Sequence, residues 1–550
     1  MKKIALTILS FVVTFVACFA NSANFSFFRY KGKDLRFDKA IDRQTEYFNP
    51  ILSGFYPDPS ICRKGDTYYL VNSSFSFFPA VPIFESKDLV NWNQIGHVLD
   101  RESQVPLLGK GINRGIFAPA ISYNEYNDTF YMITTNEGNG NFYVKSRDPH
   151  MGWSEPIYLP KVSGIDPSFF FDSDGKAYIV HNSGVSGKEE YPGQRAIRIL
   201  QFDVKGDSII GDPKEIIRGG SSVDSKPFWI EGPHLYRIGQ YYYLMCAEGG
   251  TGDRHSEVMF RSDSPMGAWE ECPYNPILTQ RTGLDPHRED IVTSTGHADI
   301  IDTPDGNWWA VFLGCRPYKD DYYNTGRDTY LLPVTFRDGW PIILESGVPV
   351  PTIVKKDGLQ PHTNLLTGNF EYTDHFNGAS LDMRWMFARN PQRVFYTLGE
   401  KGLSIAPLPA NLSQREPLSA LFCRQQHTCF EAETEIDFLP TSENELAGLV
   451  LLQHEDYHFV FGKTLRDGQC TVVLKRTEKT EVVVGSETIS STAPLRLKIC
   501  GDGGYYDFYY ATGNDDWQIL ARGVDAFNLS THSSGGFIGT CIGLYATTNE

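Results

Sequence analysis

Three acidic residues stand in similar short motifs that are far apart along the chain. Asp58 lies in FYPDPS, Asp166 in SGIDPSF and Glu231 in WIEGPHLY. Two carboxyl groups across a cavity can cleave a glycosidic bond, because one activates water while the other protonates the leaving oxygen. A third carboxylate beside the acid raises its pKa, since crowded like charges cannot all ionise. The motifs therefore predict acid–base chemistry if the fold brings them together.

Each of these motifs is weak when it is taken alone, because an Asp before Pro is usually part of a turn or a cap. Their weight comes from a longer repeated phrase. It has an acidic or small residue, Pro or a near substitute, a few apolar residues, a Gly/Asp turn and a Tyr/Trp-rich stretch. The copies lie about 50 to 65 residues apart. They begin at Asp58, Ala118, Asp166, Glu231 and His297.

The repeated phrase indicates a strand, a tight turn and a second strand, which is half of a four-stranded sheet. Sheets repeated at this interval and closed in a circle form a β-propeller, so we predict a five-bladed propeller over residues 47–345. The innermost strands of a propeller begin near one end of a common axis. Asp58, Asp166 and Glu231 are therefore expected to surround one cavity. Further repeat markers are Ser86–Trp92, Ser146–Trp153 and Ser262–Trp269.

The remaining parts of the chain lack this repeat and differ from it in composition and in the pattern of apolar residues. Residues 21–46 form a lead-in of uncertain structure, and residues 346–370 are rich in Pro and Gly, which is typical of a linker. Residues 371–550 alternate apolar and polar positions, most strictly over Cys429–Phe438, which predicts a β-sandwich in an all-β protein. Similar runs occur at Ala447–Leu452, Cys470–Lys475, Glu481–Val484, Leu495–Ile499, Tyr505–Tyr510 and Phe537–Tyr545.

Composition excludes some functions. The 550 residues include 50 Lys and Arg against 67 Asp and Glu, giving a net charge of −17. Nucleic-acid binding is therefore not expected, because phosphate contacts need clustered basic residues. A neutral sugar chain is compatible with this charge, although acidity alone does not indicate one. The 10 cysteines are widely spread, without zinc spacing or the pattern of a disulfide framework.

The first 20 residues carry two lysines, an apolar run and a small-residue end. This pattern predicts a secretory signal peptide and no transmembrane segment. Cleavage after Ala20 fits the small-residue rule. Alternatively, the FVAC sequence ending at Cys18 resembles a lipoprotein cleavage box, in which that cysteine would carry lipid. In either case we expect an exported protein, periplasmic or extracellular, and its oligomeric state stays open.

The motifs together resemble glycoside hydrolase family 43, in its β-xylosidase/α-L-arabinofuranosidase branch with a C-terminal concanavalin-like sandwich. The resemblance covers nearly all of the chain after the leader. It implies a five-bladed propeller and hydrolysis with inversion of the anomeric centre. It also implies that Asp58 is the general base, Glu231 the general acid and Asp166 the residue that tunes Glu231. The motifs are FYPDPS, SGIDPSF, EGPHLYRIGQYYYLMCAEGGTGDRH, STGHADIIDTPDGNWWAVFLGCRP, GRDTYLLPV and DHFNGASLDMRWMFARNP.

The resemblance also implies several substrate contacts. Arg316 of GCRP would bind sugar hydroxyls, or else form a structural ion pair. Phe77 and Phe78 would wall the terminal sugar, or else belong to the core. Further contacts are expected from His255 at the rim, from Phe117 (where the family usually has Trp), and from Phe537 of the sandwich.

His297 of TGHAD would lie on the propeller axis, and a structural calcium ion there would be held through water. No cofactor is expected to be required for the reaction. The chain ends soon after GLYATTN, where members of the family carry one more strand, so either this end diverges or the sequence is incomplete.

The motifs thus predict an exo-acting enzyme that releases β-D-xylose or α-L-arabinofuranose from plant hemicellulose oligosaccharides. Two alternatives stay open, an arabinan-cleaving member of the same family and a non-catalytic, carbohydrate-binding propeller. The sequence does not separate xylose from arabinose or fix the linkage that is cleaved.

Overall fold

The computed structural model describes residues 21–361, 366–489 and 493–549, and nearly all regular structure in them is β-strand. The helices are four single turns, η1 (Leu35–Phe37), η2 (Pro149–Met151), η3 (Phe527–Leu529) and α1 (Thr531–Ser534), as far as the described ranges go. None of these has the length or apolar character needed to cross a membrane. The predicted leader, with Cys18, lies outside the described residues.

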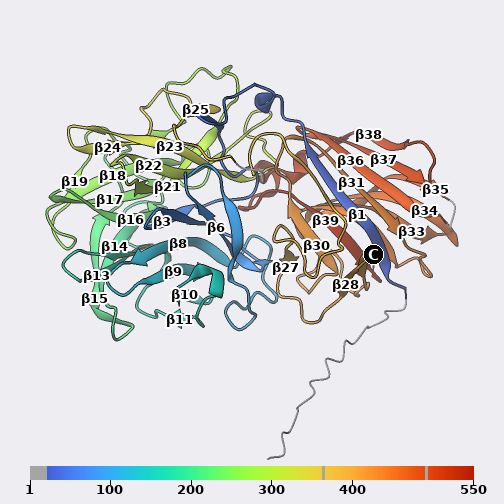
Figure 1. The fold of residues 1–550 in the computed structure, drawn as a ribbon, viewed down its shortest axis with the longest axis horizontal. Coiled ribbons are helices and arrows are strands. Elements are labelled where there is room, and N and C mark those ends of the chain that lie inside the picture. Colours follow the sequence, from blue (N-terminus) through green and yellow to red (C-terminus); the bar gives the residue numbers. More distant parts are fainter. Residues whose placement is uncertain (1–20, 362–365, 490–492, 550) are drawn as a thin grey trace, which may run out of the picture.

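Between residues 60 and 342 the described chain forms five antiparallel sheets, which follow one another in sequence order (Figure 1). We call them together the sheet ring. The first contains β3 (Ser60–Lys64), β4 (Thr67–Val71), β6 (Ala80–Ser86) and β7 (Asn93–Leu99). The second contains β8 (Ile116–Asn124), β9 (Thr129–Asn136), β10 (Gly140–Ser146) and β11 (Ile157–Tyr158). The third contains β12 (Ile165–Phe171), β13 (Ala177–Gly184), β14 (Arg195–Asp203) and β15 (Ser208–Arg218).

The last two sheets follow the same order. The fourth contains β16 (Glu231–Ile238), β17 (Tyr241–Glu248), β18 (Ser256–Ser262), β19 (Glu270–Glu271) and β20 (Leu278–Thr279). The fifth contains β21 (Thr293–Asp302), β22 (Trp308–Cys315), β23 (Arg327–Arg337) and β24 (Trp340–Ile342). Strands such as β9 are buried along their whole length, because neighbouring sheets cover both faces.

The inner strands β3, β8, β12, β16 and β21 neighbour one another in a closed cycle. A residue with left-handed backbone stands near the start of each one: two residues before β3, at the second or third residue of β8, β12 and β16, and at the fifth residue of β21. These residues are Asp58 (φ 52°), Ala118 (34°), Asp166 (54°), Gly232 (54°) and His297 (51°). Gly232, not Glu231, therefore occupies the position equivalent to Asp58. The predicted fourth copy of the repeat began at Glu231, one residue too early. Glu231 therefore reaches the site from the residue before the one equivalent to Asp58.

Hydrogen bonds near the axis join each inner strand to the next. We call this set the axial hydrogen-bond ring. Asp299 closes it, because its carboxylate accepts from Ser60 Oγ at 2.8 Å and from Tyr236 Oη at 2.6 Å. The remaining links are Ile121 N–H to Ser60 Oγ (3.0 Å), Ser122 Oγ to Phe169 O (3.1 Å) and Ser168 Oγ to Pro233 O (2.6 Å).

The second part of the described chain is a sandwich of two sheets, on the right in Figure 1. One sheet has the order β28 (Tyr396–Gly399), β29 (Gly402–Ile405), β1 (Ala23–Gly32), β31 (Cys429–Asp437), β36 (Leu495–Asp502), β37 (Tyr505–Thr512) and β38 (Gln518–Asp525), and β26 (Glu371–Asp374) also pairs with β1. The other has β30 (Ala420–Arg424), β39 (Cys541–Thr547), β32 (Leu446–His454), β33 (Tyr457–Arg466), β34 (Gln469–Glu478) and β35 (Thr480–Thr488).

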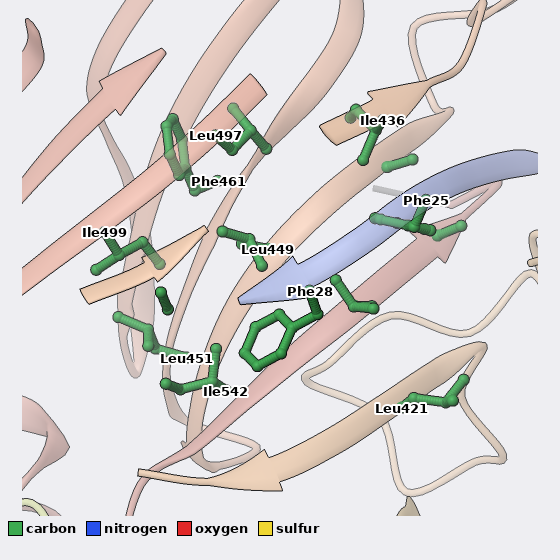
Figure 2. Packing of buried hydrophobic residues seen from close by; sticks show 14 of the residues in the cluster. Phe25, Phe28, Leu421, Ile436, Leu449, Leu451, Phe461, Leu497, Ile499 and Ile542 are labelled. Atoms are coloured by element: carbon green, nitrogen blue, oxygen red, sulfur yellow. The ribbon is translucent and has the colours of Figure 1, made fainter. Parts of the chain in front are cut away.

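The core between these two sheets is apolar (Figure 2). Phe28 from β1, Leu449 from β32 and Leu497 from β36 are fully buried in it. The predicted alternation is confirmed in β31, where Phe430, Ala432, Thr434 and Ile436 are buried and the residues between them are half-buried. Strands also form at the other predicted runs, although β39 begins only at Cys541.

The predicted lead-in and linker have more structure than expected. β1 is an inner strand of the sandwich, paired with β31 over Asn24–Gly32, and Figure 1 shows it in blue among orange and red strands. β2 (Glu46–Phe48) pairs with β25 (Ile353–Lys355), so the lead-in and the linker hold each other. A further short pair joins β5 (Phe77–Phe78), which lies between β4 and β6 along the chain, to β27 (Phe387–Ala388).

The axial ring gives a stability prediction. In Asp299→Ala the buried donors Ser60 Oγ, Ile61 N–H and Tyr236 Oη lose their acceptor. We expect the free energy of unfolding, measured by denaturant titration, to fall by about 2–4 kcal/mol. The control is Asp302→Asn on the same strand, whose partly exposed pair with Arg63 is worth about 1 kcal/mol or less. Equal stability of the two variants would contradict a closing role for Asp299.

Candidate active site

The structure brings Asp58, Asp166 and Glu231 to one end of the axis, and all three carboxyl groups are buried. Asp58 and Asp166 line one small axial cavity, together with the starts of all five inner strands. Gly232 N–H, next to Glu231, donates to Asp166 Oδ2 at 3.2 Å. The left-handed backbone at Asp58, Asp166 and Gly232 is unfavourable except for glycine, and its retention at non-glycine positions is typical of functional sites.

Asp58 is held in its ionised form. Arg327 Nη1 donates to Oδ1 at 2.7 Å, and Ser73 Oγ donates to Oδ2 at 2.6 Å. Burial opposes ionisation, but Arg327, the neighbouring His297 and Ser73 outweigh it and lower the pKa of Asp58. Ser73 Oγ also accepts from Ala118 N–H, so the partner of Asp58 is itself fixed to the second sheet.

In contrast to Asp58, Glu231 and Asp166 have raised pKa values and favour the protonated form. Burial, followed by the charges of Asp166 and Asp58, raises the pKa of Glu231 well above its usual value. Burial and the charge of Asp58 raise the pKa of Asp166 to about 7. At neutral pH the site thus offers an ionised carboxylate in Asp58 and a protonated carboxyl in Glu231, which is the pair that acid–base cleavage requires.

Three phenylalanines form a cluster beside Arg327. Phe75 stacks on Phe537 with ring centres 5.8 Å apart, and Phe117 lies 5.4 Å from Phe75 and 6.0 Å from Phe537. The Arg327 guanidinium lies 5.9 Å from the ring centres of both Phe75 and Phe537. Phe117 and Phe537 are thus brought together beside the carboxylates, where aromatic faces can pack against the C–H groups of a sugar.

Phe537 reaches this position because the sandwich is fixed to the sheet ring. Asn113 Oδ1 accepts from the backbone N–H groups of Phe537 at 2.7 Å and Ile538 at 3.1 Å. Arg389, a buried residue of the sandwich part, donates its backbone N–H to Ser76 O at 2.7 Å and pairs with Glu455. The wall of the site therefore depends on both parts of the molecule.

Arg316 does not reach the site, which corrects its predicted role. Its side chain is 0% exposed and bonds to Asp328, Asp34 and the backbone oxygen of Gln426. A guanidinium with all its polar neighbours inside the protein cannot bind sugar hydroxyls without breaking these pairs. The structural alternative is the correct one, and Arg327, eleven residues further on, faces Asp58.

Two other expectations also need correction. Phe77 is 0% exposed and packs on Phe55 and Phe422, so it belongs to the core. Phe75 is also buried, at 2% exposed, and supports the half-buried rings of Phe117 and Phe537 from behind. His255 is buried below the expected rim, with Nδ1 at 3.1 Å from Ser294 O, and burial lowers its pKa to about 3. Phe78 is half-buried, and nothing places it against the carboxylates.

His297 lies on the axis as expected, with Nδ1 at 3.9 Å from Asp58 Oδ1, and burial lowers its pKa to about 4. The axial cavity beside it has a volume of about 10 Å³, enough for about one water molecule. Calcium takes about six to eight oxygen ligands, and the described residues contain no group of three or more His, Cys, Asp or Glu that could hold a metal. These residues do not fit a hydrated calcium ion.

Comparison with known proteins agrees with this geometry. The model of glycosyl hydrolases family 43 matches residues 47–341, and that of the β-xylosidase C-terminal concanavalin A-like domain matches residues 373–550. The chain belongs to glycoside hydrolase family 43. It is therefore a glycosidase, and its all-β architecture is the propeller of this family with the C-terminal concanavalin A-like domain.

Relatives of this family 43 enzyme cover most of its length. A xylosidase/arabinosidase of Butyrivibrio fibrisolvens is 38% identical over 517 residues, which are 91% of this chain and 96% of the relative. A non-reducing end α-L-arabinofuranosidase of Bacteroides ovatus is 36% identical and covers 92% of both chains. A family 43 structure from a capybara gut metagenome has a TM-score of 0.88 and 42% identity, over 96% of this chain and 99% of that one.

Arg327 and Phe75 are the site residues that sequence reasoning missed. Arg327 lies in GRDTYLLPV, one of the motifs that carried the resemblance, and Phe75 lies in SSFSFF, two residues before the predicted Phe77. Arg327 could have been predicted from the rule that a buried carboxylate, such as Asp58, is paired with a cationic side chain. Nothing in the SSFSFF motif distinguishes Phe75 from Phe77, because both are apolar and two residues apart.

The ion pair of Arg327 with Asp58 predicts a pH effect. Asp58 must be ionised to act as the predicted general base, and Arg327→Met removes the charge that lowers its pKa. We expect the acidic limb of the kcat/KM profile to move to higher pH by about one unit or more. Arg337→Met, at the exposed end of the same strand, should leave the limb in place. An unmoved limb in Arg327→Met would show that Arg327 does not set the ionisation of Asp58.

Proposed function

We propose that this family 43 enzyme is an exo-acting glycosidase that releases β-D-xylose or α-L-arabinofuranose from the non-reducing ends of hemicellulose oligosaccharides, with inversion. Its sheet ring acts as a five-bladed propeller domain spanning residues 47–345, and the sandwich, residues 371–550, forms part of the site. The observation that carries the proposal is the opposite protonation preference of Asp58 and Glu231 in one buried site.

In this mechanism Glu231 donates its proton to the oxygen of the leaving group while the bond to the anomeric carbon breaks. Asp58 accepts a proton from a water molecule, whose oxygen attacks the anomeric carbon from the opposite face. The products are a sugar of inverted configuration and the shortened oligosaccharide with a new hydroxyl group. Asp166 keeps Glu231 protonated through its charge and holds the adjacent Gly232 N–H.

Two observations favour a terminal xylose or arabinofuranose as the sugar that is released. The relatives are a xylosidase/arabinosidase and a non-reducing end α-L-arabinofuranosidase. In addition, Phe537 of the sandwich stands against the propeller wall, and a walled pocket favours release of single sugars over internal cleavage. An arabinan-cleaving activity would need a more open groove. A purely sugar-binding protein would not need three crowded carboxyl groups.

Cellular location and metal content are further parts of the proposal. The pattern of residues 1–20 supports export to the periplasm or the outside of the cell, with cleavage after Ala20 or lipidation at Cys18. The reaction needs no metal in this scheme, because the carboxyl groups supply both proton transfers. A calcium ion near His297 stays a prediction that the small axial cavity does not support.

The function is tested with nitrophenyl β-D-xyloside, nitrophenyl α-L-arabinofuranoside and xylobiose. We expect turnover by the wild type, and a loss of about 10²- to 10⁴-fold in kcat for Asp58→Asn on all cleaved substrates. Glu231→Gln should lose a similar factor on xylobiose but less on the nitrophenyl glycosides, because nitrophenolate leaves without acid help. NMR of the first product should show the inverted anomer.

Glu270→Gln, on the same sheet as Glu231 but exposed, is the matched control and should keep wild-type rates. Saturable sugar binding by the wild type without any product would reject the enzyme in favour of the binding protein.

The role of Asp166 is tested separately on xylobiose, which requires the acid. Glu231 must be protonated, and the charge of Asp166 raises its pKa. In Asp166→Asn this charge is removed, so we expect the alkaline limb of the kcat/KM profile to move to lower pH. Asp174→Asn, in the exposed turn after β12, is the control. A limb that stays in place in Asp166→Asn would reject the tuning role.

A further inference from the structure

Two adjacent aromatic residues lie directly before Glu231. Phe228 and Trp229 belong to residues 219–230, which connect β15 to β16. Phe228 is 43% exposed and Trp229 is half-buried, and their ring centres lie 6.1 Å apart. Large aromatic side chains normally bury most of their surface. An accessible pair beside a buried catalytic carboxyl is therefore a candidate ligand contact.

The ring of Phe228 is held between two glycines. A Cβ atom on Gly193 would come within 2.2 Å of one edge of the ring, and a Cβ on Gly250 within 3.0 Å of the other edge. The backbone is tied on both sides, because Trp229 N–H donates to Gly193 O at 2.9 Å and Gly249 N–H donates to Phe228 O at 2.7 Å. The exposed ring is thus fixed in place rather than free to turn away.

Trp229 is fixed by a second set of contacts. Its φ of 54° is unusual for a bulky residue and is retained only where the surroundings enforce it. The Arg195 guanidinium lies 4.7 Å from the centre of the indole, and its Nη2 donates to Asn182 Oδ1 at 3.0 Å. Asn182 Nδ2 in turn donates to the backbone oxygen of Ile230. The same contacts therefore position Trp229 and the backbone that carries Glu231.

Trp229 lies two residues before Glu231 along the chain, and its side chain acts to lower the pKa of Glu231, against the larger effect of burial. A general acid must face the oxygen that joins the released sugar to the leaving group. Trp229, which shares its supporting contacts with the backbone of Glu231 and lies beside the exposed ring of Phe228, is therefore placed along the path of the leaving group.

We propose that Phe228 and Trp229 form a platform on which the leaving-group sugars of the oligosaccharide pack. This inference rests on the proposed function. The occupant is a neutral sugar chain, because its C–H faces match the aromatic rings and its first unit is bonded to the oxygen that Glu231 protonates. The terminal sugar, in contrast, is held on the side of Asp58, Arg327 and Phe537.

The test compares Phe228→Ala with the wild type on two substrates that share the released sugar. Xylotriose leaves two sugar units, whereas β-D-xylosyl fluoride leaves only fluoride. The arabinofuranosyl counterparts are used if arabinofuranosides are cleaved faster. We expect KM for xylotriose to rise roughly three- to tenfold with kcat nearly retained. The ratio of the two kcat/KM values, xylotriose over fluoride, should fall by the same factor.

Phe228→Leu removes the aromatic ring but keeps an apolar side chain between the glycines. It replaces Phe228→Ala in the same measurement if that variant does not fold. Phe336→Ala removes an equally exposed ring, 44%, on β23 and should keep the wild-type ratio. An unchanged ratio in both Phe228 variants would overturn the platform. An equal loss of kcat/KM on both substrates would also overturn it, because it would mean that Phe228 only supports the fold. If the wild type cleaves neither substrate, the proposed function fails and this inference with it.

Discussion

The closure of the inner strands around one axis is the constraint on which the site depends. Asp299 receives hydrogen bonds from Ser60 on the first sheet and Tyr236 on the fourth. Ser60 lies two residues after Asp58, and Tyr236 lies on the strand that begins with Glu231. The contacts that close the circle thus fix the strands that carry the proposed base and acid. Their mutual position is a property of the ring, because no local segment contains both residues.

This closure brings three carboxyl groups close together in a buried site, and the repulsion between their charges keeps some of them protonated. Three buried carboxyl groups in one place destabilise the fold unless some stay protonated. Of the three carboxyl groups, Arg327 and Ser73 donate hydrogen bonds only to that of Asp58, so Asp58 ionises while Glu231 retains its proton. The carboxyl of Asp166, with its pKa raised to about 7, binds its proton more tightly in the folded state than in the unfolded chain. Its contribution to stability therefore falls as the pH rises from about 4 to about 7.

The repeated phrase was enough to predict the sheets and the meeting of the three carboxylates, because such a repeat has few other ways to close. The alternation in Cys429–Asp437 likewise predicted a sandwich strand. β1 was missed because a bulge between Phe25 and Phe27 interrupts its period-two pattern and its partners are some 400 residues away. Arg316 was chosen over Arg327 because the motifs contain both, and only the tertiary packing decides which guanidinium meets Asp58.

Arg316 nevertheless affects the site indirectly. It joins Asp34 of the lead-in, Asp328 of the propeller and the backbone oxygen of Gln426 in the sandwich. Asp328 is the neighbour of Arg327 and also accepts from Gly54 N–H. A buried ion pair of this kind adds little net stability, but it fixes one arrangement of the groups it connects. Since β1 also lies within the sandwich, the chain before the propeller and the chain after it hold Arg327 in register with Asp58. The site is therefore a product of both domains, although its carboxylates all come from one.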